Sequence, residues 1–265
     1  FVHIISRVSL FGVAIGTAAL ILILSVFNGF EDLILSMYNS FDPHIKITAK
    51  HSKVFNPEIA QNYITSIDEI AYSSQVLEEK ALLKYQQKEF IATIKGVSPS
   101  YLKQTNFDSL LVEGSYFNDY ENNQVTIVGR GVAYHLSLAI GSVFDQLEVY
   151  IPNRNSRTLL NPKTAFKQAA VLPVGVFGIQ ADIDAEYIIS PLDFVQQLTN
   201  RDNEVSAIEI QLKDEESIAQ VQLQLQQYLG SAYQVKNRVE QQDFLYKILN
   251  IEKLAVFLIL AFIMI

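Results

Sequence analysis

The sequence predicts an α+β protein in which a membrane-spanning helix precedes a large aqueous domain, and three observations support this prediction. Residues 8–30 contain no Lys, Arg, Asp or Glu, and about 20 apolar helical residues are enough to cross a bilayer core of about 30 Å. More than 200 residues with mixed strand and helix patterns follow. A second apolar run, residues 254–265, closes the sequence.

Both apolar runs have an alternative interpretation. A cleaved signal peptide has an apolar core of about 7–15 residues and then a small-residue cleavage site, whereas the first run is longer and continues to Phe30. A buried core helix is the alternative for the second run. Because the sequence begins with Phe and ends inside an apolar run, we expect it to be a fragment of a longer membrane protein.

The charges indicate an orientation and exclude one class of partner. Arg7 precedes the first apolar run and acidic residues follow it, which favours a cytoplasmic N-terminus and places residues 31–252 on the other side of the membrane. Of the 20 Lys and Arg residues, only Arg7 and Lys253 lie outside that range. Residues 31–252 therefore contain 18 basic and 28 acidic residues, and their net charge is −10. This balance disfavours nucleic acid. With no Cys, the domain must be held by its own core.

Two strand–helix–strand segments predict a domain that is split by an insertion. The first has an alternating strand at 43–49 and a helix that opens at Asn56-Pro57. The second has an alternating strand at 206–212 and a helix with an apolar stripe that stops at Gly230. Both helices contain Ile-Ala-Gln. This suggests an internal repeat, although coincidence at Gln and Ala positions is the alternative.

The patterns divide the chain into five expected parts. Strands are predicted at 71–76, 81–85, 90–97, 125–129, 147–151, 169–177, 186–190 and 232–235. The parts are a membrane helix at 8–30, a split α+β domain formed by 31–97 and 204–237, an inserted β-rich domain at 98–203, a connecting helix at 238–252, and the start of a second membrane helix at 253–265.

The sequence contains no recognisable catalytic constellation or metal site. Its four His residues are scattered, whereas zinc needs three or four convergent ligands. Asp182, Asp184 and Glu186 alternate, which suggests either a cation site or an acidic turn before a strand. Gly129-Arg130-Gly131 is too short for a phosphate-binding loop. We therefore expect no catalytic residue, bound cofactor or metal.

Two features suggest contact surfaces. Gly12 and Gly16 form a small-xxx-small pair in the first apolar run, a spacing that lets membrane helices approach closely. Residues 152–168 lie between two predicted strands and combine basic residues, an apolar centre and no acid. We interpret this segment as a docking hairpin, with a disordered surface loop as the alternative. The residues expected to carry docking are Arg154, Arg157, Leu159, Leu160, Pro162 and Lys163.

The first 47 residues combine several short motifs. The pair Ile5-Ser6 leads into a glycine-containing span, the span ends in Leu-Ser-Val-Phe-Asn-Gly-Phe-Glu at 24–31, and Pro43-His44-Ile45 follows. This combination resembles the LolC/LolE family of lipoprotein-releasing permeases. The rest of the chain is more loosely similar to the wider group of MacB-like and FtsX-like permeases.

The resemblance implies an inner-membrane, multi-pass subunit of an ABC transporter, with residues 31–252 periplasmic. The split domain would be a porter-like part and the insertion a sabre-like part. The resemblance also implies a separate cytoplasmic ATPase that binds ATP, a second permease copy or paralogue, lipoproteins as cargo, and a periplasmic carrier that docks on the hairpin.

Leu20, Ile23 and Phe27 are the expected contacts with membrane lipid. A MacB-like efflux permease and an FtsX-like activator of a cell-wall hydrolase are the alternative functions. Whether the chain is LolC-like or LolE-like, and whether it forms homodimers or heterodimers, is left open.

Overall fold

The computed structural model describes residues 2–38, 42–104, 109–116, 124–140, 146–153, 165–242, 247, 251–258 and 262. The chain forms two compact units. One consists of residues 1–42 and 238–265, and the other of residues 43–237.

The first unit is dominated by α1 (Val2–Tyr38), a helix of 37 residues. Its segment Leu10–Phe30 is long and apolar enough to cross a membrane, and it is the one such segment among the described residues. The expected span at 8–30 therefore lies inside a longer helix. Residues 251–258 are also helical. Part of the expected connecting helix at 238–252 lies outside the described residues, so its continuity stays a prediction.

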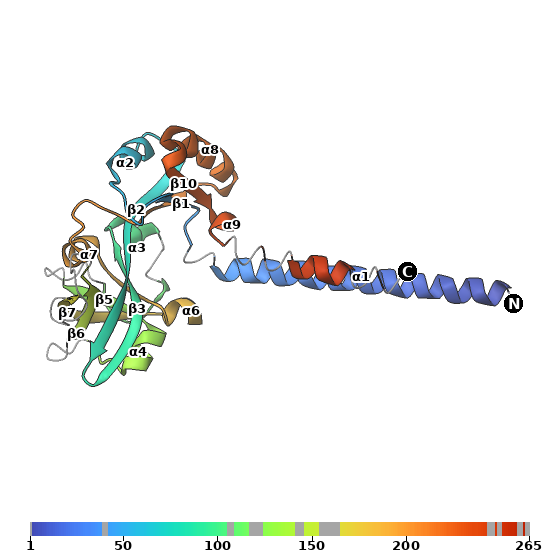
Figure 1. Ribbon diagram of the computed structural model, residues 1–265, viewed down its shortest axis with the longest axis horizontal. Helices are drawn as coiled ribbons and strands as arrows, with labels where there is room; N and C mark the ends of the chain where they lie inside the picture. The colour runs from blue at the N-terminus through green and yellow to red at the C-terminus, as the bar shows by residue number, and fades with distance from the viewer. Residues whose placement is uncertain are drawn as a thin grey trace. The chain divides into compact units, whose positions relative to one another are not determined.

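The second unit is built around a ten-stranded sheet (Figure 1). Its elements in chain order are β1 (Ile45–Ala49), α2 (Glu58–Ile64), β2 (Ile70–Tyr85), β3 (Lys88–Val97), α3 (Ser100–Gln104), β4 (Leu111–Gly114), β5 (Val125–Gly129), α4 (Arg130–Leu136), β6 (Leu147–Pro152), β7 (Phe166–Phe177), α6 (Ala181–Asp184), β8 (Tyr187–Pro191), α7 (Leu192–Thr199), β9 (Ala207–Leu212), α8 (Ile218–Leu229) and β10 (Tyr233–Asn237); α9 (Arg238–Gln241) follows in the first unit.

Residues 43–76 and 207–237, which we call the helical lobe, follow a ferredoxin-like βαββαβ order. The strands lie in the order β10-β1-β9-β2, and every neighbouring pair is antiparallel. Residues from α2 and α8 join the strands in one hydrophobic cluster, and Figure 1 shows both helices beside this part of the sheet. The two predicted strand–helix–strand segments are thus the two halves of one fold.

The helices of this lobe begin and end where the sequence indicates. The Asn56 side chain accepts a hydrogen bond of 2.9 Å from the Glu58 backbone N–H at the start of α2. In α8, Val221, Leu225 and Leu229 are buried at helical spacing, and Gly230 follows with a φ of +70°. A positive φ at this position favours Gly because it has no Cβ.

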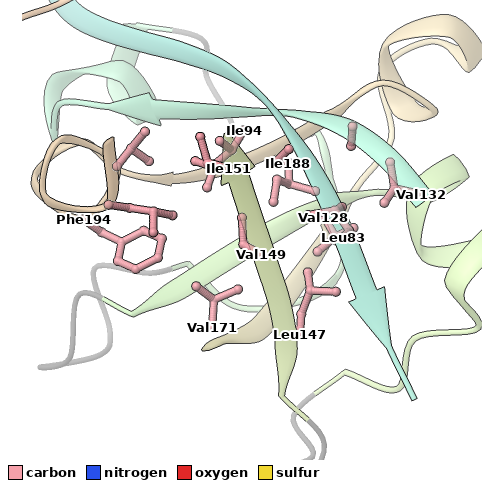
Figure 2. Close-up of a cluster of buried hydrophobic side chains, with 14 of the residues drawn as sticks. Leu83, Ile94, Val128, Val132, Leu147, Val149, Ile151, Val171, Ile188 and Phe194 are labelled. Carbon is pink, nitrogen blue, oxygen red and sulfur yellow. The ribbon is translucent and has the colours of Figure 1, made fainter. Parts of the chain in front are cut away.

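The remaining strands form a second lobe within residues 77–206, which we call the barrel lobe. Val205, just before β9, still packs in the hydrophobic cluster of the helical lobe. Six strands pair in a closed circuit that runs β2-β3-β8-β5-β7-β6 and returns to β2. Closure removes exposed strand edges. The interior holds a second hydrophobic cluster, in which side chains such as Leu83, Val149 and Ile188 point toward one another (Figure 2).

The structure corrects two expectations about this region. The strands expected at 71–76 and 81–85 are one strand of 16 residues, β2, which runs from the helical lobe into the barrel lobe and pairs there with β3 (Figure 1). Residues between Leu77 and Ile94 belong to the barrel cluster. The division between the two cores therefore falls inside β2, near Val76, and not at residue 97. The porter-like and sabre-like roles of the lobes stay predictions.

This division predicts which excision leaves a folded remnant. Val76 and Ala207 are register partners on antiparallel strands, so an Asn-Gly turn between them closes a hairpin of ordinary geometry. We expect residues 43–76 joined in this way to 207–237 to melt cooperatively, as measured by circular dichroism. Replacing only 98–203 should instead give an aggregating product, because Leu77, Leu83 and Ile94 lose their barrel partners. The reverse result would contradict the two-core division.

Candidate functional site

The described residues confirm the base of the predicted hairpin. Strands β6 and β7 pair antiparallel, with Pro152 opposite Phe166, and the Asn153 backbone N–H donates a 2.7 Å hydrogen bond to the Ala165 carbonyl. Residues 154–164 lie outside the described residues, and with them all six residues expected to dock. The structure therefore confirms the paired base of the hairpin, whereas the docking role of these six residues stays a prediction.

The hairpin base borders a cavity of about 240 Å³. Pro152, Asn153 and Lys167 line one side, and the other side is formed by the end of α7 and the loop after it. In that loop Arg201 donates to the Glu204 carboxylate at 3.1 Å. Sequence reasoning missed α7, although its buried residues Leu192, Val195 and Leu198 have the three-residue spacing of one helix face.

The expected membrane contacts all lie in α1. Leu20, Ile23 and Phe27 are three and four residues apart, which places them along one side of a helix. A Cβ built on Gly12 meets no described atom within 4 Å, and Gly16 lies one turn further on. Lipid contact by the first three residues and helix packing by the two glycines stay predictions.

Asp184 and Glu186, two of the three acidic residues in 182–186, have structural partners. Asp184 is buried, and its carboxylate accepts hydrogen bonds from the backbone N–H groups of Ile179 at 2.7 Å and Gln180 at 3.3 Å. Glu186 pairs with Lys80 at 2.6 Å. Gly129 packs so closely on Asp184 that a Cβ would lie 2.2 Å from its carbonyl oxygen. The Gly-Arg-Gly turn thus allows a close approach of α4 to α6.

An ionic cluster lies where the two lobes meet. Lys95 on β3 contacts both carboxylate oxygens of Glu209 on β9 at 2.9 and 3.1 Å, and both side chains are 1% exposed. Glu78 on β2 lies 3.8 Å from Lys95, and Lys46 on β1 lies 3.6 Å from Glu209 and 3.9 Å from Glu78. Two ammonium groups thus balance two carboxylates.

The cluster shifts the pKa values of Lys95 and Glu78 toward their charged forms. Burial lowers the pKa of Lys95, but the carboxylates of Glu209 and Glu78 outweigh burial and hold this pKa above its ordinary value. Burial likewise raises the pKa of Glu78, and the ammonium groups of Lys46 and Lys95 more than reverse that effect. The ring of Tyr101, which is fully buried, lies 4.8 Å from the Lys95 ammonium.

Among the described residues, no group of three His, Asp or Glu side chains is arranged to hold a metal ion. His44, which is 4% exposed, accepts a 3.0 Å hydrogen bond at Nδ1 from the Leu212 backbone N–H. This histidine therefore connects the start of β1 to the end of β9.

A sequence profile of MacB-like periplasmic core domains matches residues 6–228, most of the chain. The chain belongs to this family. It is 24% identical over 259 residues to the lipoprotein-releasing system transmembrane protein LolE of Haemophilus influenzae, covering 93% of this chain and 59% of LolE. It is also 25% identical over 190 residues to LolC of Buchnera aphidicola subsp. Acyrthosiphon pisum, covering 71% of this chain and 45% of that protein.

These matches confirm the resemblance to LolC and LolE. The chain spans about half to three fifths of the length of these relatives.

Solved structures support the fold. The periplasmic region of MacB from Actinobacillus actinomycetemcomitans has a TM-score of 0.52 at 13% identity, and the match covers 79% of this chain and 95% of that one. The extracellular domain of the noncanonic ABC-type transporter YknZ from Gram-positive bacteria has a TM-score of 0.51 at 15% identity. This match covers 73% of this chain and 99% of the YknZ domain. The expected α+β fold of the MacB-like type is therefore confirmed.

The ionic cluster predicts a strongly non-additive pair of substitutions. Lys95→Met leaves Glu209 buried with one cation fewer, which should cost about 3 kcal/mol or more of the free energy of unfolding. In Lys95→Met/Glu209→Leu, Lys46 and Glu78 remain matched, so we expect most of that loss to be recovered. The measurement is urea unfolding of residues 43–237.

Lys80→Met is the matched control for this cycle. Lys80 pairs with Glu186, but their side chains are 64% and 47% exposed, so the expected change is below about 1 kcal/mol. A double variant that is no more stable than Lys95→Met would refute the charge-balance account.

The shifted pKa values also predict how stability depends on pH. The folded-state pKa of Glu78 lies below its ordinary value of about 4.5. Its ionised form therefore contributes stability above that pH, and the contribution is lost as the pH falls through the folded value. The difference in Tm between the unsubstituted domain and Glu78→Gln should be constant near neutral pH and shrink below about pH 4.5. A Tm difference that grows below about pH 4.5 would contradict a folded-state pKa of Glu78 below its ordinary value.

Proposed function

We propose that this chain is the membrane subunit of an ABC transporter that extracts lipoproteins from the inner membrane and passes them to a periplasmic carrier. The observation that carries the proposal is the similarity to LolE over 93% of the chain. The apolar segment Leu10–Phe30 and the β6–β7 hairpin base support it. In this proposal the protein is multi-pass and residues 31–252 are periplasmic.

Lipid extraction sets an energetic requirement. Each buried CH₂ group contributes about 0.8 kcal/mol to membrane anchoring, so a lipoprotein with several acyl chains does not leave spontaneously. We place ATP hydrolysis on a separate cytoplasmic ATPase, because the sequence has no phosphate-binding motif. The chain itself would then be a non-catalytic permease subunit without a cofactor of its own.

The proposal gives roles to the predicted contact residues. Leu20, Ile23 and Phe27 on α1 would contact the acyl chains or membrane lipid as the cargo leaves the bilayer. Gly12 and Gly16 would allow a second membrane helix to approach α1 closely. The hairpin segment 154–164 would bind the carrier.

An efflux permease of the MacB type is the second candidate function. The fold likeness to the periplasmic region of MacB, with a TM-score of 0.52, favours it. Depletion of the protein separates the two candidates. Lipoprotein release predicts that lipoproteins accumulate in the inner membrane, as measured by membrane fractionation. Normal lipoprotein sorting after depletion would refute the leading proposal.

The hairpin gives a sharper prediction for the carrier. In docking interfaces a few apolar and Arg anchors carry most of the affinity. Replacing Leu159 and Leu160 by Ala should therefore weaken carrier binding by more than about 2 kcal/mol. Arg157→Ala or Lys163→Ala should mostly slow association and reduce its salt dependence. The measurement is titration of residues 43–237 with the purified carrier.

Ile91→Ala is the matched control, because Ile91 is an apolar residue of β3 that is 70% exposed and lies outside the hairpin. It should leave carrier affinity unchanged. The Tm should be the same in all these variants. Unchanged affinity after deletion of 154–164 would exclude docking by this segment.

A further inference from the structure

Strand β10 lies at one end of the described sheet. The strand order begins β10-β1-β9, so β10 has β1 on one side and no further described strand on the other. The backbone groups on such an outer edge can pair with an extended segment of another polypeptide, and natural proteins often cover them. The partners of these outward groups therefore decide whether the edge of β10 is open.

The pairing with β1 shows which backbone groups of β10 point outward. In an antiparallel pair, alternate residues direct both backbone groups toward the partner strand, and the residues between them direct theirs away. The Ala232 carbonyl accepts a 2.9 Å hydrogen bond from the N–H of Lys50, which directly follows β1. Alternation then turns residues 234 and 236 toward β1, and it turns Tyr233 and Val235 away from it.

Helix α8 supplies the partners of these outward groups. The side-chain amide of Gln226 accepts a 3.1 Å hydrogen bond from the Val235 N–H and donates to the Tyr233 carbonyl at 3.2 Å. The side-chain amide of Gln222 donates to the Val235 carbonyl at 2.9 Å. Two side chains thus bind three consecutive outward groups of the strand.

These hydrogen bonds imitate a neighbouring strand. A residue of a parallel strand donates to one carbonyl and accepts from the N–H two residues further along its partner. The Gln226 amide makes the same two bonds to residues 233 and 235. Gln222 lies one turn before Gln226 on the same side of the helix, and the Asn237 side chain donates to it at 3.0 Å and so orients its amide. The helix therefore places two amides where a further strand would lie.

We propose that Gln222 and Gln226 are an autoinhibitory contact that closes the outer edge of β10 to strand addition by an extended segment of another polypeptide. The inference goes beyond the proposed function and does not rest on it, because it uses only contacts within the helical lobe. The apolar side of α8 packs in the core separately from these two amides. The edge can therefore be opened without unfolding the helix.

Hydrogen exchange tests whether the two amides protect the edge. In the full chain in detergent, Gln222→Ala/Gln226→Ala should speed exchange of the Val235 amide about ten-fold, because that N–H loses its hydrogen-bond acceptor. Ala is the best helix former, so α8 should stay intact. Gln220→Ala/Gln227→Ala is the matched control, since both residues are exposed on the same helix, and it should leave this exchange unchanged.

A strand-forming peptide tests whether the opened edge accepts a strand. The probe is a fluorescent peptide with the sequence of residues 44–50, which contains the natural partner strand of β10. Fluorescence anisotropy should show saturable binding to Gln222→Ala/Gln226→Ala that is about ten-fold tighter, or more, than binding to the unsubstituted chain or the control variant. The same peptide with Ile47→Pro should not bind, because proline lacks the N–H that a sheet requires.

A single variant keeps the test decisive if the double variant has a lower Tm. Gln226→Ala removes the acceptor of the Val235 N–H but leaves Gln222 on the Val235 carbonyl. It should give the faster exchange together with an intermediate affinity for the peptide.

The outcomes that overturn the inference are specific to the edge. They are unchanged Val235 exchange in the double variant, equal peptide binding by the double variant and the unsubstituted chain, and binding of the proline-containing peptide. Faster exchange without peptide binding would also overturn it, because the amides would then protect the backbone of an edge that accepts no strand. None of these results depends on lipoproteins or on the carrier, so the proposed function can fail or hold independently.

Discussion

The buried ion pair between Lys95 and Glu209 constrains how the two lobes of residues 43–237 meet. Both side chains are 1% exposed, and they join β3 to β9 where the two hydrophobic clusters end. Glu78 and Lys46 complete a cluster in which the charges balance. A buried charge without a partner costs several kcal/mol, so the strands can move apart here only at high cost. The cluster therefore favours one fixed arrangement of the lobes along the shared strand β2.

This arrangement places the β6–β7 hairpin and helix α8 on different lobes of the same unit, residues 43–237. The β6–β7 hairpin begins from two strands of the closed barrel circuit and borders the end of α7. Helix α8 belongs to the other lobe, where it packs on the ferredoxin-like sheet. A closed barrel and a helix-covered sheet both resist deformation because their cores are densely packed.

The residues that resemble the LolC/LolE family also have structural roles that the resemblance alone does not supply. His44 in the Pro-His-Ile segment accepts a backbone hydrogen bond from Leu212 and so helps to join β1 to β9. Gly129, in a Gly-Arg-Gly segment that is too short for a phosphate-binding loop, allows close packing against Asp184. In both cases a short motif is explained by backbone geometry, which is decided by elements far away in the sequence.

The sequence by itself determined the apolar helix, the family resemblance, both halves of the helical lobe and most of its helix ends, because these follow from local periodicity and capping. It also determined the position of the hairpin between two strands. Only the tertiary structure decided that β2 is one continuous strand, that six strands close into a circuit, and that Glu209 and Lys95 are buried. Alternation along a strand such as β9 assigns residues to two faces, but it does not reveal what covers the second face. Here the second face is covered by another lobe, and long-range pairing of that kind leaves no local pattern.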